Sequence, residues 1–219
     1  MAKIISMSFG KNSIDCMLSG SIGNEVWYIR NGINYKRKKA VSVSNPKTQG
    51  QLDHRARFTA LIKFLQPLKD LLRVGFESQT GNMSAFNAAM SCNYKTAIGG
   101  AYPEFRIDYS KVMVSCGKLT GAFHPAVTST ITGKVDFTWE DNSCFDDAWA
   151  DDRVMLVVYS IDRQEAVTII GGHFRAGGSQ RIALPALFSG DEVQCFIGFQ
   201  NARQSIVSDS KYVGGLVVK

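Results

Sequence analysis

The sequence predicts a mainly β protein with a small α part, in which an α+β N-terminal module precedes an antiparallel β-sandwich. Three observations lead to this prediction. Short runs rich in Val, Ile, Phe and Tyr recur at even spacing after residue 103, separated by Gly, Ser and Asp. Apolar residues at helical spacing are confined to the first half, and an Asn-Gly pair marks a hairpin near the start. We therefore expect two domains, residues 1–103 and 104–219.

Residues 3–40 are expected to form short strands, with a β-hairpin at Asn31-Gly32. Asn-Gly is the strongest short-range hairpin signal, because both residues tolerate the positive φ angles of a type I′ turn. A two-residue turn at this position sets the register of the two strands. The predicted cross-strand pairs are Arg30 with Ile33, Tyr28 with Tyr35, Val26 with Arg37, Ile29 with Asn34, and Trp27 with Lys36. The last pair permits a cation–π contact.

A first helix is expected to begin near Thr48, which has the capping-box spacing to Gln51. Apolar residues then recur at three-four spacing as far as Leu72. Pro67 removes a backbone donor and crowds the preceding turn, so the helix should kink or restart there. Gly75 is the expected end.

A second helix is expected with Asn82 or Ser84 as its N-cap, and Gly99-Gly100 should end it. Beyond residue 103 the apolar runs are too many and too evenly spaced for a parallel α/β fold. Alternation in residues 135–139 and 193–199 predicts one buried and one wet face for each strand. The expected strands are 105–108, 111–115, 126–131, 134–139, 153–160, 165–170, 179–184, 192–199 and 211–218, forming a sandwich of seven to nine strands.

Two resemblances support this architecture. Leu184-Pro185 and a Gly-Asp corner precede a strand that carries Phe196, and this part is similar to fibronectin type III and immunoglobulin-like modules. Motifs spread over nearly the whole chain resemble an uncharacterised family from Bacteroidetes that carries a domain-of-unknown-function label. The motifs are Asn45-Pro46-x-Thr48-x-x-Gln51, Phe86-Asn87-Ala88-Ala89, Tyr102-Pro103, Asp108-Tyr109-Ser110-Lys111-Val112 and Phe137-Thr138-Trp139. The family resemblance implies an architecture and no activity.

The net charge of +6 is unevenly distributed, since residues 1–103 carry 14 basic against 5 acidic residues and the remainder carries 11 against 14. This division predicts either a polyanionic partner for the first half or attraction between neighbouring copies. The hairpin is either a nucleic-acid-binding ribbon or a structural element whose lysines keep the sheet edge soluble. Residues that would contact a polyanion or a protein partner are Trp27, Tyr28, Arg30, Tyr35, Lys36, Arg37, Lys38, Lys39, Arg55 and Arg57.

Residues 140–152 form the densest acidic run. Calcium is one interpretation, although the regular Asp-x-Asp-x-Asp-Gly spacing is missing. The other is a solvated loop between strands, anchored by Trp149 packing on the sandwich, which could dock the basic half of a neighbour. The carboxylates proposed to meet a partner are Glu140, Asp141, Asp146, Asp147, Asp151 and Asp152.

No catalytic, cofactor-binding or metal-binding motif is found. The three histidines lie far apart, and the five cysteines lack C-x-x-C spacing and are expected to be reduced thiols. A small-molecule substrate is therefore not expected. The first residues lack a continuous apolar stretch, so we expect a cytoplasmic protein, with signal-independent export or virion association left open.

The expected function is that of a non-enzymatic structural or adhesion-like interaction protein, as a component of an assembly. The alternative is a nucleic-acid-associated protein that binds through the basic aromatic hairpin and the first helix. Carbohydrate binding through Trp27, Trp139 or Trp149 depends on which rings are exposed. Trp139 lies in an alternating strand and is expected in the core.

Overall fold

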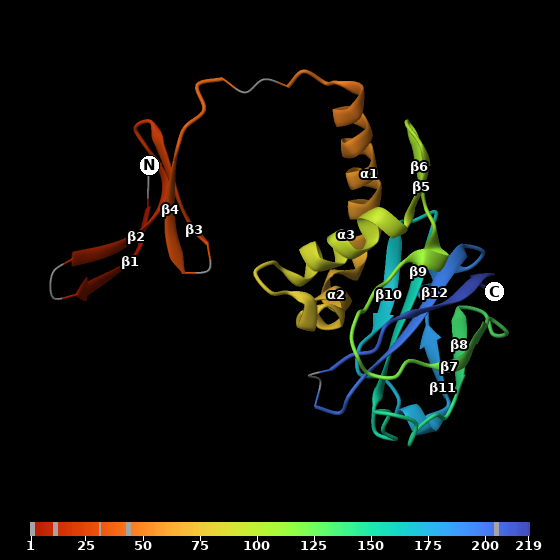
Figure 1. Cartoon of the computed structure of the whole chain (residues 1–219). Helices are drawn as coiled ribbons and strands as arrows, with labels where there is room; N and C mark the ends of the chain where they lie inside the picture. Colours follow the sequence, from red (N-terminus) through yellow and green to blue (C-terminus); the bar gives the residue numbers. More distant parts are fainter. Residues whose placement is uncertain (1–2, 11–12, 31, 43–44, 204–205) are drawn as a thin grey trace. The chain divides into compact units, whose positions relative to one another are not determined.

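The computed structural model describes residues 3–10, 13–30, 32–42, 45–203 and 206–219, with side chains described from residue 19 onward. The chain forms two compact units, Met1–Lys47 (unit 1) and Thr48–Lys219 (unit 2). The boundary expected between residues 103 and 104 lies inside unit 2, because the helices share a core with the sandwich. Figure 1 shows the elements of each unit.

Unit 1 is a four-stranded antiparallel sheet in the order β1-β2-β3-β4. Consecutive strands pair with their sequence neighbours, as in a meander. The short strands expected between residues 3 and 40 are therefore present. The bounds are β1 Lys3–Gly10, β2 Ser13–Ile22, β3 Glu25–Arg30 and β4 Ile33–Lys38.

The first predicted helix begins where expected. The Thr48 hydroxyl accepts a hydrogen bond from the Gln51 backbone N–H at 3.4 Å. Pro67 lies in a 3-10 turn that interrupts the helix, and the helical path resumes before ending at Gly75. The successive elements are α1 Gln49–Leu65, the turn η1 Gln66–Leu68, α2 Lys69–Gly75 and a second turn, η2 Glu77–Gln79.

The second predicted helix, α3 (Ala85–Thr96), is capped by Ser84, whose hydroxyl accepts from the Asn87 N–H at 3.3 Å. Gly99-Gly100 was expected to end this helix, but α3 already ends at Thr96. Both glycines lie in a strand, β5 (Ile98–Ala101), which pairs with β6 (Glu104–Ile107). The sequence did not predict β5.

The strand expected at residues 111–115 is absent, and a 3-10 turn, η3 (Tyr109–Lys111), leads into an irregular segment. Side chains replace a strand neighbour as hydrogen-bond partners. The Met113 N–H donates to the Asn93 side-chain oxygen at 2.8 Å, and the Val114 N–H donates to the Ser210 hydroxyl at 2.8 Å. Those partners lie far away in sequence, so local pattern did not reveal them.

The rest of unit 2 is an antiparallel β-sandwich. A four-stranded sheet in the order β10-β9-β12-β13 faces a three-stranded sheet in the order β11-β8-β7. This confirms the predicted fold class, a mainly β protein with an immunoglobulin/fibronectin-III-like sandwich. The bounds are β7 Phe123–Thr128, β8 Lys134–Glu140, β9 Arg153–Ser160, β10 Glu165–Ile169, β11 Ser179–Ala183, β12 Glu192–Gln200 and β13 Lys211–Val217.

The core between the two sheets contains alternate residues of the central strands. Val135, Phe137 and Trp139 point inward from β8, as the alternation predicted. Trp139 is 5% exposed and packs edge-on against Phe199 of β12. The cysteines whose side chains the structure describes are free thiols, and Cys195 lies in this core, where burial raises its pKa to about 12.

A second core lies on the outer face of the four-stranded sheet, under the helices (Figure 1). Met155, Val157 and Tyr159 of β9 and Phe196 of β12 pack there against helical side chains such as Phe64. The prediction that one face of residues 193–199 is exposed to solvent is therefore wrong, because the helices cover that face. Among the described residues, no helix is long and apolar enough to cross a membrane.

Candidate functional site: the basic ribbon and the acidic loop

The β3–β4 ribbon of unit 1 has the register that the Asn-Gly turn predicted. Tyr28 lies opposite Tyr35, and Trp27 lies opposite Lys36. Gly32 has a φ of 76°, as a type I′ turn requires, whereas Asn31 lies outside the described residues. The Lys36 Nζ atom is 5.5 Å from the centre of the Trp27 ring, so the predicted cation–π contact is confirmed.

The two faces of the ribbon carry different groups, because successive side chains of a strand point to opposite faces. Tyr28 and Tyr35 stack with their ring centres 5.6 Å apart, and Arg37 lies on the same face. Trp27 and Lys36 lie on the other face, where Lys36 Nζ is also 3.4 Å from the Glu25 carboxylate. The predicted contact residues of the ribbon are therefore divided between two surfaces.

Arg30 also belongs to the tyrosine face, and Lys38 belongs to the tryptophan face. The Lys39 backbone N–H donates to the Asn24 carbonyl at 2.8 Å, just beyond the end of β4. All residues of β4 are exposed. None of the described residues from 19 to 42 is buried. Both faces of the ribbon are accessible.

Arg55 and Arg57 belong to α1 of unit 2, so the structure does not place them with the ribbon. Arg57 forms an ion pair with Asp53 at 3.1 Å, and its guanidinium lies 4.8 Å from the centre of the Phe105 ring. These contacts hold β6 against α1, which is a structural role. Arg55 lines a pocket on the same helix.

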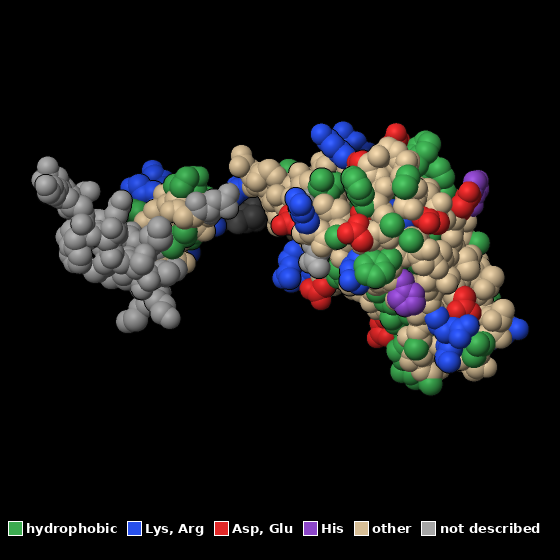
Figure 2. Space-filling view, turned by 90° about the horizontal axis from the view of Figure 1, so that it is seen from below, with side chains coloured by type: hydrophobic (Ala, Val, Ile, Leu, Met, Phe, Trp, Pro, Cys, Tyr) green, Lys and Arg blue, Asp and Glu red, His purple; other side chains and the backbone are tan. Residues whose placement is uncertain are grey.

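The net positive charge is confined to a shorter segment than the predicted residues 1–103. Unit 1 carries eight Lys and Arg against two Asp and Glu, whereas unit 2 carries seventeen of each. The whole net charge of +6 therefore belongs to unit 1. On the face of unit 2 seen in Figure 2, basic and acidic side chains are interspersed. The net charge of the chain therefore resides on the smaller unit.

The predicted acidic residues lie at the end of β8 and in the loop that leads to β9, and residues 140–152 are hereafter called the acidic loop. One of these residues, Asp152, is buried and cannot contact a partner. Asp152 is 0% exposed and is paired with Arg175, which is also 0% exposed. The Asp152 Oδ2 atom accepts from Arg175 Nε at 3.0 Å and from the Trp149 backbone N–H at 2.9 Å. Asp152 is therefore a structural residue, not a surface contact.

Arg175 uses its other guanidinium nitrogens to hold neighbouring segments. Its Nη1 donates to the Asn142 side-chain oxygen at 2.8 Å, and its Nη2 donates to the Thr120 carbonyl at 2.8 Å. The guanidinium also stacks 3.9 Å from the centre of the Phe199 ring. In turn, the Trp139 indole N–H donates to the Arg175 carbonyl at 2.7 Å. The sequence carried no local signal for this buried cluster.

The remaining carboxylates of the acidic loop are exposed. Asp147 accepts from the Thr120 hydroxyl at 2.6 Å and from its N–H at 2.9 Å, and these hydrogen bonds lower the pKa of Asp147. Asp141 accepts from the Ser143 N–H at 3.0 Å, which lowers its pKa likewise. Both groups stay ionised at neutral pH. The exposed carboxylates are Glu140, Asp141, Asp146, Asp147 and Asp151.

Trp149 does not anchor the acidic loop on the sandwich, because its side chain is 68% exposed. The buried contacts of Asp152 and Ala148 hold the loop instead. Phe145 is also exposed, at 51%. The acidic loop therefore presents aromatic rings together with carboxylates.

The described residues contain no group of three or more His, Cys, Asp and Glu side chains arranged to hold a metal ion. His54 bonds to the Tyr94 hydroxyl at 2.8 Å, and His124 lies 2.6 Å from the Glu140 carboxylate. His173 contacts the Ser179 carbonyl at 2.9 Å. Each histidine thus has a separate local partner.

Comparisons with known proteins give a family and a structural likeness to solved proteins. A family model described as a family of unknown function, DUF6266, matches residues 17–214. A comparison with curated proteins finds no match. The solved structures that are similar include the fn3 domain of human contactin 1, with a TM-score of 0.33 and 12% sequence identity, covering 47% of this chain and 82% of that chain.

Proposed function

This chain belongs to the DUF6266 family, whose function is unknown, and from its own surfaces we propose a non-enzymatic interaction protein that joins an assembly. One observation carries the proposal: unit 1 holds the whole net charge of +6, and none of its described residues from 19 to 42 is buried. A ribbon such as β3–β4, whose described side chains are unburied on both faces, gains stability when a partner covers it. Unit 1 is therefore the part through which the chain associates.

The partner is a second copy of the chain, contacted at its acidic loop. Charge complementarity supports this choice, because the loop presents five exposed carboxylates while unit 1 carries an excess of six positive charges. The aromatic side chains Trp149 and Phe145 add apolar area beside the carboxylates. Such a contact joins two different surfaces, so successive copies add head to tail.

Nucleic acid is a weaker candidate for the same ribbon. A single-strand-binding surface combines a basic groove with aromatic rings on which bases stack. Here Tyr28 and Tyr35 already stack on each other, and Lys36 and Arg37 lie on opposite faces. The ribbon therefore divides its cations between surfaces instead of lining one groove.

Light scattering after size exclusion, at salt concentrations from 20 mM to 1 M, tests the proposal on the full chain. We expect oligomers at low salt and monomers at high salt, because the Debye length falls from about 20–30 Å to about 3 Å over this range. The ribbon variant Lys36→Glu/Lys38→Glu and the loop variant Asp146→Lys/Asp151→Lys should each be monomeric at every salt concentration.

Mixing the two variants provides the sharpest result. A mixture pairs the wild-type ribbon of one variant with the wild-type loop of the other, so it should form 1:1 complexes that neither variant forms alone. The control variant Arg73→Glu/Lys118→Glu changes two exposed cations of unit 2 and should associate like the wild type. A wild-type monomer at 20 mM salt, or ribbon-dependent gel retardation of DNA without self-association, would exclude this partner.

A further inference from the structure

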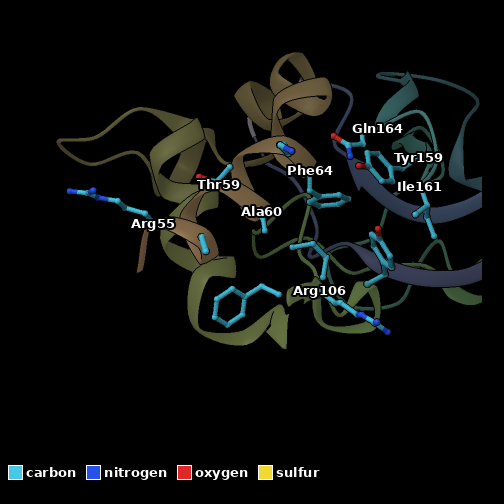
Figure 3. A pocket seen from close by; sticks show the side chains of 13 residues that line it. Arg55, Thr59, Ala60, Phe64, Arg106, Tyr159, Ile161 and Gln164 are labelled. Atoms are coloured by element: carbon cyan, nitrogen blue, oxygen red, sulfur yellow. The ribbon is translucent and has the colours of Figure 1, made fainter. Parts of the chain in front are cut away.

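Unit 2 contains a pocket of about 670 Å³ beside helix α1. Figure 3 shows Thr59, Ala60 and Phe64 of α1, Arg106 of β6 and Tyr159 of β9 around one space, whereas the Arg55 side chain extends away from the other labelled residues. The volume lies within the range of about 300–1,000 Å³ typical of small-molecule sites. The lining residues are Arg55, Ala56, Thr59, Ala60, Lys63, Phe64, Phe105, Arg106, Ile107, Tyr109, Tyr159, Ile161 and Gln164.

All charged residues of this lining are cations. Arg55 and Lys63 come from α1, and Arg106 comes from β6, whereas no Asp or Glu lines the pocket. Unit 2 as a whole carries equal numbers of basic and acidic residues, so a lining whose charged side chains are all cations departs from this balance, with Lys63 and Arg106 as the cations that the proposal uses. An anionic group near the mouth would be attracted to it.

The floor of the pocket is aromatic. The Phe64 ring contacts Tyr159 and Tyr109 edge-on, with ring centres 4.8 Å and 5.7 Å apart. Phe64 is 2% exposed and Tyr159 is 3% exposed, so these rings are fixed by packing. Burial raises the pKa of Tyr159 to about 12 and also raises that of Tyr109, so both hydroxyls stay neutral donors.

The walls are held by specific contacts. The Arg57 guanidinium packs on Phe105 and keeps β6 close to α1. On the opposite side, Gln164 has a φ of 56°, a left-handed conformation that is uncommon outside glycine and asparagine. Its backbone N–H donates to the Ser160 carbonyl at 3.1 Å, which closes the turn after β9 and places Gln164 in the lining. The cavity is therefore largely formed before any ligand binds.

We propose that this pocket binds a small anionic molecule with an aromatic or apolar body. The body would cover the floor of Phe64, Tyr109 and Tyr159, and the anionic group would meet Lys63 and Arg106 at the mouth. A carboxylate and a phosphate satisfy the same cations. This site is independent of the association through unit 1, because all of its residues belong to unit 2.

Fluorescence titration of the full chain with 8-anilinonaphthalene-1-sulfonate, an aromatic sulfonate, tests the proposal. The variants Lys63→Gln and Arg106→Gln should each weaken binding about tenfold, the factor expected when a charge-assisted hydrogen bond of about 1.4 kcal/mol is lost. N-phenyl-1-naphthylamine, which lacks the sulfonate, should bind more weakly to the wild type and equally to all variants. Benzoate and phenyl phosphate distinguish the two anion types by competition.

The variant Lys36→Gln/Lys38→Gln serves as the matched control, since it removes two cations from unit 1 and leaves the pocket intact. It should bind the sulfonate as the wild type does. Unchanged binding by both pocket variants, equal loss in the unit 1 control, or no displacement by either competitor would each overturn the proposal. Unfolding midpoints of all variants show whether a loss of binding reflects a loss of folding.

Discussion

Replacing Asp152 with Asn tests whether the buried ion pair with Arg175 stabilises unit 2. Both side chains are at most 1% exposed, and the Asp152 Oδ2 atom lies 3.0 Å from the Arg175 Nη2 atom. The substitution preserves the shape of the side chain and removes its charge, so the buried guanidinium loses its direct ion-pair partner. Breaking a buried pair by removing one partner costs about 3–5 kcal/mol.

We expect Asp152→Asn to lower the free energy of unfolding of unit 2 by about 3 kcal/mol, the low end of this range, because the asparagine oxygen can still accept the hydrogen bonds from Arg175 and from the Trp149 N–H. In a domain of 150–250 residues each kcal/mol lowers Tm by about 2–4 °C, so the midpoint should fall by about 6–12 °C. Urea and thermal unfolding, followed through the fluorescence of the buried Trp139, measure both quantities.

The matched control is Asp136→Asn, which breaks an exposed Arg–Asp pair of the same chemistry. Arg181 Nε lies 2.6 Å from the Asp136 carboxylate, but the two side chains are 50% and 21% exposed. Water already solvates this pair, so its loss should shift the midpoint much less. Equal shifts for Asp152→Asn and Asp136→Asn would refute the argument that burial of the pair sets the cost.

Three further predictions concern the same unit. A Cβ at Gly117 would collide with the Val207 backbone, so Gly117→Ala should destabilise unit 2 by about 1–3 kcal/mol in urea, whereas Gly177→Ala, which meets open space, should not. Asn93→Ala removes the buried side chain that bonds to the backbone of the following irregular segment, and we expect a loss of about 1–3 kcal/mol in the same assay. The pKa of Asp147 is lowered in the folded chain, so its stabilising contribution is present above its unfolded pKa of about 3.9 and is lost as the pH falls through the folded value. Asp147→Asn should therefore lose less stability than the wild type between pH 6 and pH 3, and an equal loss would contradict this assignment.

Local rules explain which parts of the fold the sequence predicted. The turn at Gly32 sets the register of the ribbon, because a two-residue loop leaves only one pairing. Thr48 and Ser84 mark helix starts, since their hydroxyls bond to N–H groups three residues away. Strand β9 was recognisable as a continuous apolar run because it is buried on both faces.

The Bacteroidetes origin stays a prediction.

Long-range partners explain what the sequence did not reveal. Residues 111–115 have strand-like composition, yet their backbone bonds to Asn93 and Ser210, far away along the chain. Arg175 and Asp152 each look like surface residues until the fold buries them together. The domain boundary lies after Lys47 and not after residue 103 for the same reason, because the helices pack on the outer face of the sandwich.

The position of β4 at the rim of its sheet restricts how two ribbons can meet. A two-fold symmetric pair formed edge to edge through this strand and centred on Arg37 would place Lys36 of one copy opposite Lys38 of the other. Like charges facing each other across a strand pair repel, and lysine on a free edge discourages continuous sheet growth. The cations of β4 therefore oppose pairing between two copies of this edge strand, and so they oppose fibrous aggregation. The same cations leave the strand free to contact an oppositely charged surface.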